Sequence, residues 1–188
     1  VNEWLKSRKS RVAEGSYASY QKKAADFLTH LGQAICQQSM RTLTPQQIES
    51  FLAAQLRRGV KGSTINNTLK AIRACLTWCR KKGFMDRNPA EAVEFVPEET
   101  RGKQPFTAEQ LRTLYRAAND DWKGMILLGY TLGLRLGDAA GMRWESTNLP
   151  GNTITYRQQK AKRMAAPKDV TTVLLPELAN YLAQRKAR

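Results

Sequence analysis

Apolar residues recur at helical spacing along much of this chain. The clearest run begins after Ser63 and Thr64, where apolar residues step by four, three, four and three positions: Ile65, Leu69, Ile72, Leu76 and Cys79. Similar spacing predicts a short basic helix over residues 2–9 and a longer helix that Ser16 caps. With one more helix after Thr44, the first half of the chain is expected to contain four helical segments.

Helix boundaries are also marked in the sequence. Thr44 and Thr107 each precede a glutamine by three residues, the pattern of a capping box, and therefore predict helix starts. A basic last turn followed by glycine is a helix stop, so Arg57-Arg58-Gly59 ends the third helix without needing a functional role. Asn88-Pro89 directs the chain out of helix after the fourth.

The second half of the chain adds two short β-strands to its helices. β-Branched and aromatic residues predict strands at 153–156 and 170–175, joined by a long basic connection over 157–168. A last helix is expected from Pro176, with an apolar face formed by Leu178, Tyr181 and Leu182. The fold class is therefore predicted as mainly α with a small β-hairpin or sheet (α+β).

Residues 97–105 are rich in proline and charge and poor in apolar side chains, which predicts a linker. The linker separates a helical N-terminal domain, residues 1–96, from a second domain, residues 106–188. With 188 residues and 41% hydrophobic content, the chain is long enough to bury a core in each of two small domains.

The charge of the chain indicates a partner. Its 31 lysines and arginines exceed its 16 aspartates and glutamates, which gives a net charge of +15 that is spread over both halves. Such an excess favours a polyanionic partner, above all nucleic acid. No apolar run is long enough to span a membrane and no signal-peptide pattern opens the chain, so a cytoplasmic protein without membrane contact is expected.

The cysteines and the histidine predict neither a metal nor another cofactor. Cys36, Cys75 and Cys79 are an odd number without zinc spacing, which indicates reduced thiols packed as small hydrophobic side chains. His30 is the single histidine of the chain, and one histidine cannot anchor a metal site unaided.

Arg135 is the leading candidate for chemistry, because it interrupts an apolar run over residues 125–136. The run is expected to be buried, and a buried guanidinium needs a carboxylate or a phosphate as its partner. Asp138 would share a helix face with Arg135, so one interpretation is an internal ion pair. The other interpretation is a phosphate site, because arginine can bind phosphate through two parallel hydrogen bonds.

A second candidate surface is a polar stripe beside the apolar face of the fourth helix. Five residues form this stripe: Asn66, Lys70, Arg73, Thr77 and Lys81. Such side chains on one helix flank can contact phosphates and base edges in a major groove, although a solvated helix face has the same pattern. Lys22 and Lys23 lie off the apolar stripe of the second helix and are further candidates for DNA binding.

Residues 131–144 read Thr-Leu-Gly-Leu-Arg-Leu-Gly-Asp-Ala-Ala-Gly-Met-Arg-Trp, which resembles the first catalytic-arginine box of the tyrosine recombinases, the phage integrase family. The sequence Ser-Thr-Ile-Asn-Asn-Thr-Leu at 63–69, Trp78, and Gly-Phe-Met-Asp-Arg-Asn-Pro at 83–89 are similar to that family's core-binding domain. The resemblance implies an N-terminal SAM-like helical core-binding domain that clamps DNA, followed by the first part of the catalytic domain.

Members of this family cut and rejoin DNA at specific sites through a 3′-phosphotyrosine intermediate, without ATP or an obligatory metal. The resemblance assigns the scissile phosphate to Arg135 and the acidic position of the box to Asp138. It places the general-acid lysine at Lys160, with Lys162 as the alternative, and it leaves Lys162 and Arg163 to contact DNA. It also implies a tetramer on synapsed double-stranded DNA, a protein that can be monomeric in solution, and a prokaryotic, nucleoid-associated location.

The sequence also departs from the family pattern. After Lys168 it contains neither the family's His-x-x-Arg box nor a tyrosine suited to be the nucleophile, because Tyr181 lies on an apolar helix face. The chain begins with Val1, which suggests a piece of a longer recombinase. The alternative is a non-catalytic DNA-binding protein derived from a truncated integrase. An RNA-binding protein is less favoured, because the aromatic residues have core-like spacing.

Overall fold

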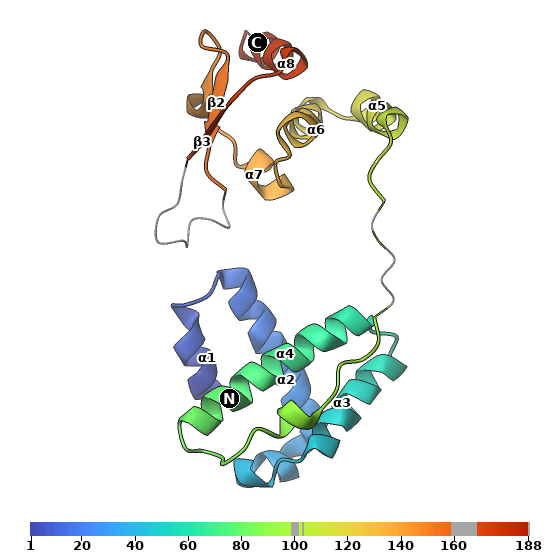
Figure 1. Ribbon diagram of the computed structural model, residues 1–188, viewed down its shortest axis with the longest axis vertical. Coiled ribbons are helices and arrows are strands. Elements are labelled where there is room, and N and C mark those ends of the chain that lie inside the picture. Colours follow the sequence, from blue (N-terminus) through green and yellow to red (C-terminus); the bar gives the residue numbers. More distant parts are fainter. Residues whose placement is uncertain (99–101, 103, 159–168, 188) are drawn as a thin grey trace. The chain divides into compact units, whose positions relative to one another are not determined.

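The computed structural model in Figure 1 describes all residues except 99–101, 103, 159–168 and 188. The chain divides into two compact units, Val1–Gly102 and Lys103–Arg188. The described residues form mostly helices and one small antiparallel sheet. This composition confirms the mainly α, α+β class expected from the sequence.

The described residues of the first unit form four α-helices, and the last helix packs against the other three (Figure 1). They are α1 (Asn2–Lys9), α2 (Glu14–Cys36), α3 (Pro45–Arg57) and α4 (Gly62–Lys81). Two short 3₁₀ turns lie at Met40–Thr42 and Pro89–Ala92. Because α4 contacts every other helix, it is the central element of this unit.

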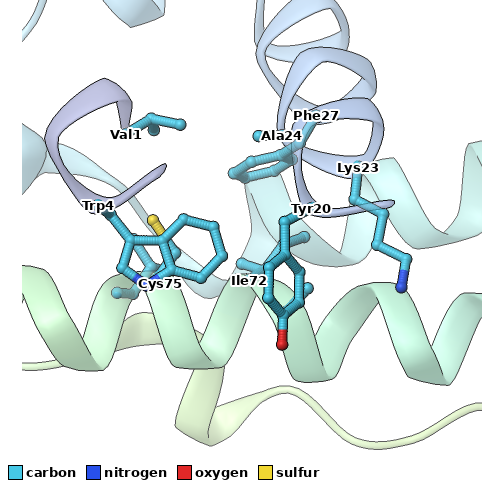
Figure 2. Close-up of a pocket in the computed structure, with 10 residues that line it drawn as sticks. Val1, Trp4, Tyr20, Lys23, Ala24, Phe27, Ile72 and Cys75 are labelled. Atoms are coloured by element: carbon cyan, nitrogen blue, oxygen red, sulfur yellow. The ribbon is translucent and has the colours of Figure 1, made fainter. Parts of the chain in front are cut away.

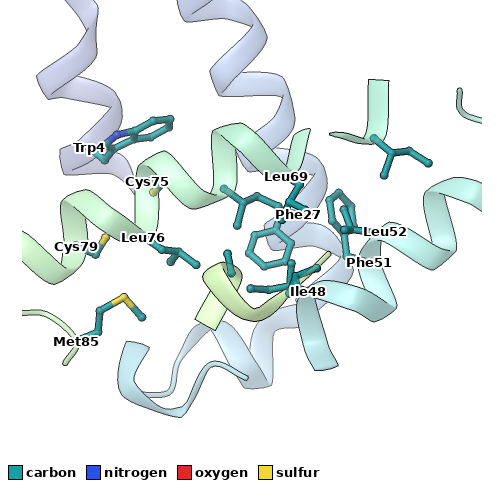
Figure 3. Close-up of a cluster of buried hydrophobic side chains, with 14 residues drawn as sticks. Trp4, Phe27, Ile48, Phe51, Leu52, Leu69, Cys75, Leu76, Cys79 and Met85 are labelled. Atoms are coloured by element: carbon teal, nitrogen blue, oxygen red, sulfur yellow. The ribbon is translucent and has the colours of Figure 1, made fainter. Parts of the chain in front are cut away.

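The apolar stripes of the four helices meet in one core. Figure 3 shows this cluster, whose large buried side chains include Trp4, Phe27, Ile48, Phe51, Leu69 and Leu76. The rings of Phe27 and Phe51 lie 5.2 Å apart between centroids, as do those of Trp4 and Tyr20. A residual cavity of about 30 Å³ lies beside Trp4 and Tyr20 (Figure 2).

In the first unit, local signals set the helix ends as the sequence predicts, except at the start of α2. In the capping box of α3, Thr44 Oγ1 accepts from the Gln47 N–H at 3.4 Å, and Gln47 Oε1 accepts from the Thr44 N–H at 2.9 Å. The chain leaves α3 at Gly59, whose φ of 76° favours glycine. The expected cap at Ser16 is wrong, because Ala13 already accepts the first helical hydrogen bond of α2.

The second unit contains four α-helices among its described residues. They are α5 (Ala108–Ala117), α6 (Asp120–Leu132), α7 (Leu136–Ala140) and α8 (Pro176–Lys186). α5 begins at the predicted capping box of Thr107 and Gln110, and α6 contacts α5, α7 and α8. α6 is therefore the central helix of this unit.

A three-stranded antiparallel sheet completes the second unit, after a 3₁₀ turn at Trp144–Ser146. Its strands lie in the order β1 (Thr147–Asn148), β2 (Thr153–Tyr156) and β3 (Val170–Val173). β2 and β3 are the two strands that the sequence predicts, whereas β1 has only two residues and no pattern that marks it. The buried core of the unit consists of Leu128, Ala139, Ile154, Leu174 and Leu178.

Tyr181 joins α8 to α6. A Cβ atom on Gly124 of α6 would lie 3.2 Å from Tyr181 Cε1, so the glycine permits close packing of the two helices. The Tyr181 hydroxyl donates to the backbone carbonyl of Asp120 and accepts from Arg185 Nη1 at 3.0 Å, and Arg185 also pairs with Asp121. These contacts hold Tyr181 as a packing residue between two helices.

The thiols differ in their surroundings. Cys75 and Cys79 are buried one turn apart on α4, as predicted for small hydrophobic side chains, but the prediction is wrong for Cys36, which is exposed. Burial raises the pKa of Cys75 from its ordinary 9.0 to about 12. Because the fold favours the neutral thiol, Cys75 contributes stability below pH 9, and this contribution is lost as the pH rises toward 12.

We expect one thiol to react with an aromatic disulfide reagent in the folded protein at pH 8 and all three to react in denaturant. Only Cys36 offers an accessible sulfur, whereas Cys75 and Cys79 are both buried and protonated. The absorbance of the thiolate released from the reagent measures the number of cysteines that have reacted. In the Cys36→Ser variant the rapid reaction should disappear, and a rapid reaction that persists would contradict the burial of the other two thiols.

Candidate nucleic-acid interface and phosphate site

Arg135 lies on the extended link between α6 and α7. α6 ends at Gly133, which adopts a left-handed φ of 63° and donates its N–H to the Gly129 carbonyl at 3.0 Å. After this turn the backbone is extended at Arg135, which is the residue directly before α7. The turn therefore takes Arg135 out of the apolar helix that precedes it.

The expectation of a buried Arg135 is wrong. The side chain is exposed, and of the apolar run over 125–136 Leu128 is buried while Tyr130 and Leu136 are exposed. The sequence prediction treated the run as one continuous buried helix, but the left-handed turn at Gly133 ends that helix before the arginine. An exposed guanidinium needs no internal counter-charge, so Arg135 is available to an external anion.

The guanidinium of Arg135 lies at the start of the basic connection. Its Nη1 donates to Gln158 Oε1 at 3.0 Å, and Gln158 follows β2 by two residues. Next to it, Arg157 donates two hydrogen bonds to the Asp169 carboxylate, at 2.6 and 2.9 Å. These bonds hold the pKa of Asp169 below its ordinary value. Arg157 and Asp169 thus join the two ends of the connection close to Arg135.

Of the other residues predicted for this site, the structure describes Asp138 alone. Asp138 is buried in the first turn of α7, and its backbone N–H donates to the Arg135 carbonyl at 2.9 Å. Lys160, Lys162 and Arg163 lie outside the described residues. Sequence reasoning missed Gln158 altogether, because no local pattern marks a glutamine as the partner of an arginine 23 residues earlier.

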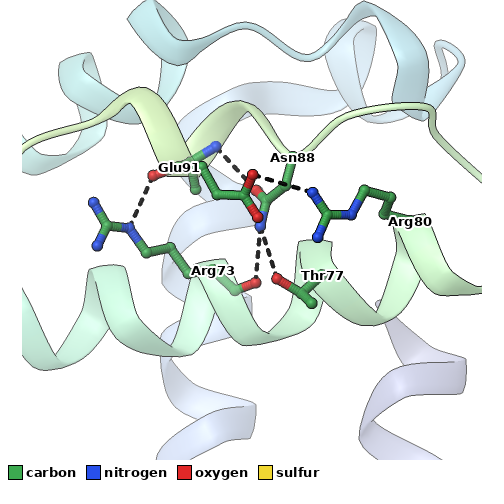
Figure 4. A network of polar contacts seen from close by, with 6 residues as sticks. Arg73, Thr77, Arg80, Asn88 and Glu91 are labelled. Atoms are coloured by element: carbon green, nitrogen blue, oxygen red, sulfur yellow. Dashed lines mark hydrogen bonds and ion pairs between the residues drawn. The ribbon is translucent and has the colours of Figure 1, made fainter.

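The polar stripe of α4 is largely occupied by the chain itself. The segment over residues 88–98, here called the strap, runs along α4 after the Pro89–Ala92 turn (Figure 4). Asn66 is only 3% exposed; its side chain donates to the Val96 carbonyl at 2.8 Å and to Glu98 at 2.7 Å, and accepts from the Val96 N–H at 2.9 Å. The expectation that Asn66 lies on an open flank is therefore wrong.

Arg73 and Thr77 of α4 also form hydrogen bonds with the strap. Arg73 Nε donates to the Ala90 carbonyl at 2.9 Å, and Arg73 also bonds to the Val93 carbonyl. Asn88 of the strap donates to Thr77 Oγ1 at 2.9 Å and to the Arg73 carbonyl at 3.1 Å (Figure 4). The Arg73 side chain thus satisfies two backbone carbonyls of the strap, and Thr77 accepts from the Asn88 side chain, which is why helical spacing alone could not assign them to DNA.

The remaining predicted DNA contacts are on the surface of the first unit. Lys70 and Lys81 of α4 are exposed, although the Lys70 amine also lies 5.6 Å from the ring centroid of Phe95. On α2, Lys22 forms an exposed ion pair with Asp26 at 3.3 Å, and Lys23 donates to the Asn67 carbonyl at 3.4 Å. Such weak, exposed contacts leave the amines able to bind a polyanion.

Within the described ranges, no three histidine, cysteine, aspartate or glutamate side chains are placed to hold a metal ion. Nor does any helix in these ranges have the length and apolar character that a membrane span requires.

The chain is similar to known integrases and recombinases. Residues 2–83, which include all of α1 to α4, match the family described as Phage integrase, N-terminal SAM-like domain. Tyrosine recombinase XerC of Methylobacterium sp. (strain 4-46) is 26% identical over 200 residues, covering 97% of this chain and 62% of the relative. XerC of Xylella fastidiosa (strain M23) is 24% identical over 126 residues, covering 64% and 43%. The chain thus spans about half the length of these relatives.

Solved structures share the fold at low sequence identity. A lambda integrase dimer bound to a COC′ core site matches 98% of this chain and 65% of its own, with a TM-score of 0.79 and 17% identity. The Tn1549 transposon integrase in complex with circular intermediate DNA matches 100% of this chain and 63% of its own, with a TM-score of 0.77 and 12% identity. At these identities the likeness shows the fold.

The first unit matches a SAM-like integrase domain, and the solved integrase structures share the fold in which a unit with a short sheet follows it. The domain match and the relatives agree on one family. The chain is similar to the tyrosine recombinases, the phage integrase family, and the resemblance found in the sequence is confirmed.

Proposed function

We propose that this chain is part of a site-specific DNA recombinase or integrase that cuts and rejoins DNA through a 3′-phosphotyrosine intermediate. One observation carries the proposal: in a chain similar to this family, Arg135 presents an exposed guanidinium at the start of the basic connection. The XerC relatives are tyrosine recombinases, which supports this activity. Because the chain spans about half of their length, the proposal concerns the natural gene product that contains it.

In this proposal Arg135 donates to a non-bridging oxygen of the scissile phosphate. The nucleophilic tyrosine attacks the phosphorus, the bond to the 5′ oxygen breaks, and negative charge accumulates on the oxygens that Arg135 contacts. A donor held in place before the reaction stabilises this charge by several kcal/mol when water is excluded, on the order of 3 kcal/mol. Gln158 and the backbone N–H of Asp138 act as positioning groups, because they hold the guanidinium and the carbonyl of Arg135.

A general acid is needed for the leaving 5′ oxygen. Lys160 in the basic connection is our choice for this role, with Lys162 as the alternative and Arg163 as a phosphate contact. The pairing of Arg157 with Asp169 supports the assignment, because it joins the ends of the connection where Gln158 meets Arg135. The reaction in this form uses neither a metal nor ATP.

Double-stranded DNA is the proposed partner, and residues 1–96 are the proposed core-binding domain that clamps it. The net charge of +15 supports this partner, and several structural neighbours are integrases bound to DNA. One neighbour is a lambda integrase tetramer bound to a Holliday junction, which supports a tetramer on synapsed DNA as the working form. We place this activity at the nucleoid, in the cytoplasm of a prokaryotic cell.

The DNA-binding part of the proposal predicts a specific salt dependence. Lys70→Ala should weaken binding of duplex DNA and lower the slope of log affinity against log salt concentration by about 0.9, the value for one lost phosphate contact. Lys123→Ala, on α6 of the second unit, removes the same charge at a residue that is not among the predicted DNA contacts, so it should leave the slope unchanged.

Fluorescence anisotropy of a labelled duplex over a salt series measures both variants. Equal slopes for Lys70→Ala and the unsubstituted protein would remove Lys70 from the interface. A duplex RNA of the same sequence that binds as tightly as the DNA would favour the RNA-binding alternative.

A further inference from the structure

The first unit has a basic pocket that lies apart from the strap. A cavity of about 420 Å³ opens between α2, α3 and the N-terminal end of α4. Its apolar floor includes Phe51 and Ile65, both buried in the core. Three cationic side chains, from Lys22, Lys23 and Arg58, line the cavity together with a single carboxylate, from Asp26.

Arg58 differs from the two lysines in having no partner among the residues that the structure describes. Lys22 already pairs with Asp26, and Lys23 with the Asn67 carbonyl. Among the described residues, none forms a hydrogen bond or an ion pair with the Arg58 guanidinium. The turn at Gly59 closes α3 directly after Arg58, and the Val60 N–H bonds back to the Gln55 carbonyl at 3.2 Å. This turn fixes the backbone from which the guanidinium projects.

We propose that this pocket binds one backbone phosphate of duplex DNA, with Arg58 as the residue that grips it; the inference rests on the proposed function. Arginine presents parallel N–H donors that match two phosphate oxygens. Lys23 adds a second positive charge, and the hydroxyls of Ser19 and Thr64 line the same cavity as further possible donors. Arg58 thus has a binding role in addition to its place in the stop signal of α3.

A polyanion suits the pocket better than a free anion does. Lys22 and Arg58 are exposed and Lys23 is partly exposed, so a single ion in water gains little from these cations. A DNA backbone gains more, because each neutralised phosphate releases condensed counterions. The strap also covers part of the polar stripe of α4, which leaves fewer cations there for phosphates than the sequence suggests.

The matched pair Arg58→Gln and Arg57→Gln tests the inference. Both arginines are exposed at the same end of α3 and carry the same charge, but only Arg58 lines the cavity. We expect Arg58→Gln to lower the salt slope of duplex binding by about 0.9 and Arg57→Gln to leave it nearly unchanged. Circular dichroism and thermal unfolding of both variants confirm that each folds as the unsubstituted chain does.

The outcomes separate this inference from the proposed function. If the natural gene product that contains this chain fails to bind duplex DNA, the proposed function is wrong. If it binds, but the two variants have equal slopes, the Arg58 pocket is wrong and the proposed function stands. Calorimetric titration with inorganic phosphate alone should show no saturable binding. Saturable binding that Arg58→Gln removes would assign the pocket to a free anion and overturn the DNA assignment.

Discussion

Arg135→Ala is expected to slow DNA strand cleavage by the natural gene product by about 10²–10³-fold while changing duplex affinity less than twofold, because the lost donor acts mainly in the transition state. Arg135 is exposed and contacts Gln158, so its loss should change the free energy of unfolding by less than about 0.5 kcal/mol. The variant therefore separates catalysis from folding and from binding.

Single-turnover cleavage of a duplex that carries the recombination site measures this effect. Arg116→Ala is the matched control, because it removes an exposed arginine from α5 of the same unit. The control should cleave at the rate of the unsubstituted protein. Arg135→Lys should recover only part of the rate, because an ammonium keeps the charge but loses the two-pronged contact with phosphate. Cleavage by Arg135→Ala at the unsubstituted rate would exclude Arg135 from the active site.

Asn66→Ala should lower the free energy of unfolding of the first unit by about 2–3 kcal/mol, because it leaves the N–H and carbonyl of Val96 without their partner. For a unit of this size, such a loss lowers the melting temperature by roughly 10 °C or more. Asn66 holds the strap at a close contact: a Cβ atom on Gly62 would lie 2.6 Å from the Pro97 carbonyl oxygen. The strap therefore has little room to shift relative to α4 at this contact.

Thermal unfolding followed by circular dichroism checks this prediction. Asn67→Ala is the control, because Asn67 is the exposed neighbour on the same helix and should shift stability by less than about 0.5 kcal/mol. Below its melting temperature, Asn66→Ala should keep the affinity for duplex DNA. A variant with unchanged stability and a lower affinity would return Asn66 to the DNA interface and contradict its role in holding the strap.

Elements with strong local signals could be predicted from the sequence. The capping boxes at Thr44 and Thr107 each span only four residues at the start of their helices. The glycine stop at Gly59 likewise acts within one helical turn. Strands β2 and β3 were predicted from their β-branched residues. The start of α2 was misplaced, because a serine near a helix start does not show whether the helix has already begun.

The site was predicted less well, because its contacts join distant parts of the chain. The strap uses Asn66 as a partner for Val96, 30 residues later, and helical spacing does not reveal such a partner. A local signal does indicate that Arg135 is exposed, because the glycine two residues before it is a helix stop. The hydrophobic residues around Arg135 instead favour the prediction of a buried helix. Gly133 marks the point at which the helix ends and the exposed link begins.

The most direct test of the account is covalent trapping of the natural full-length gene product on duplex DNA with a nick near the recombination site. The account predicts a protein–DNA adduct on a denaturing gel, formed in the presence of a metal chelator and without ATP. Mass spectrometry should identify a phosphotyrosine linkage at a residue other than Tyr181, whose hydroxyl is held between α6 and α8. Duplex binding without any adduct would contradict the recombinase and favour a DNA-binding protein without catalysis.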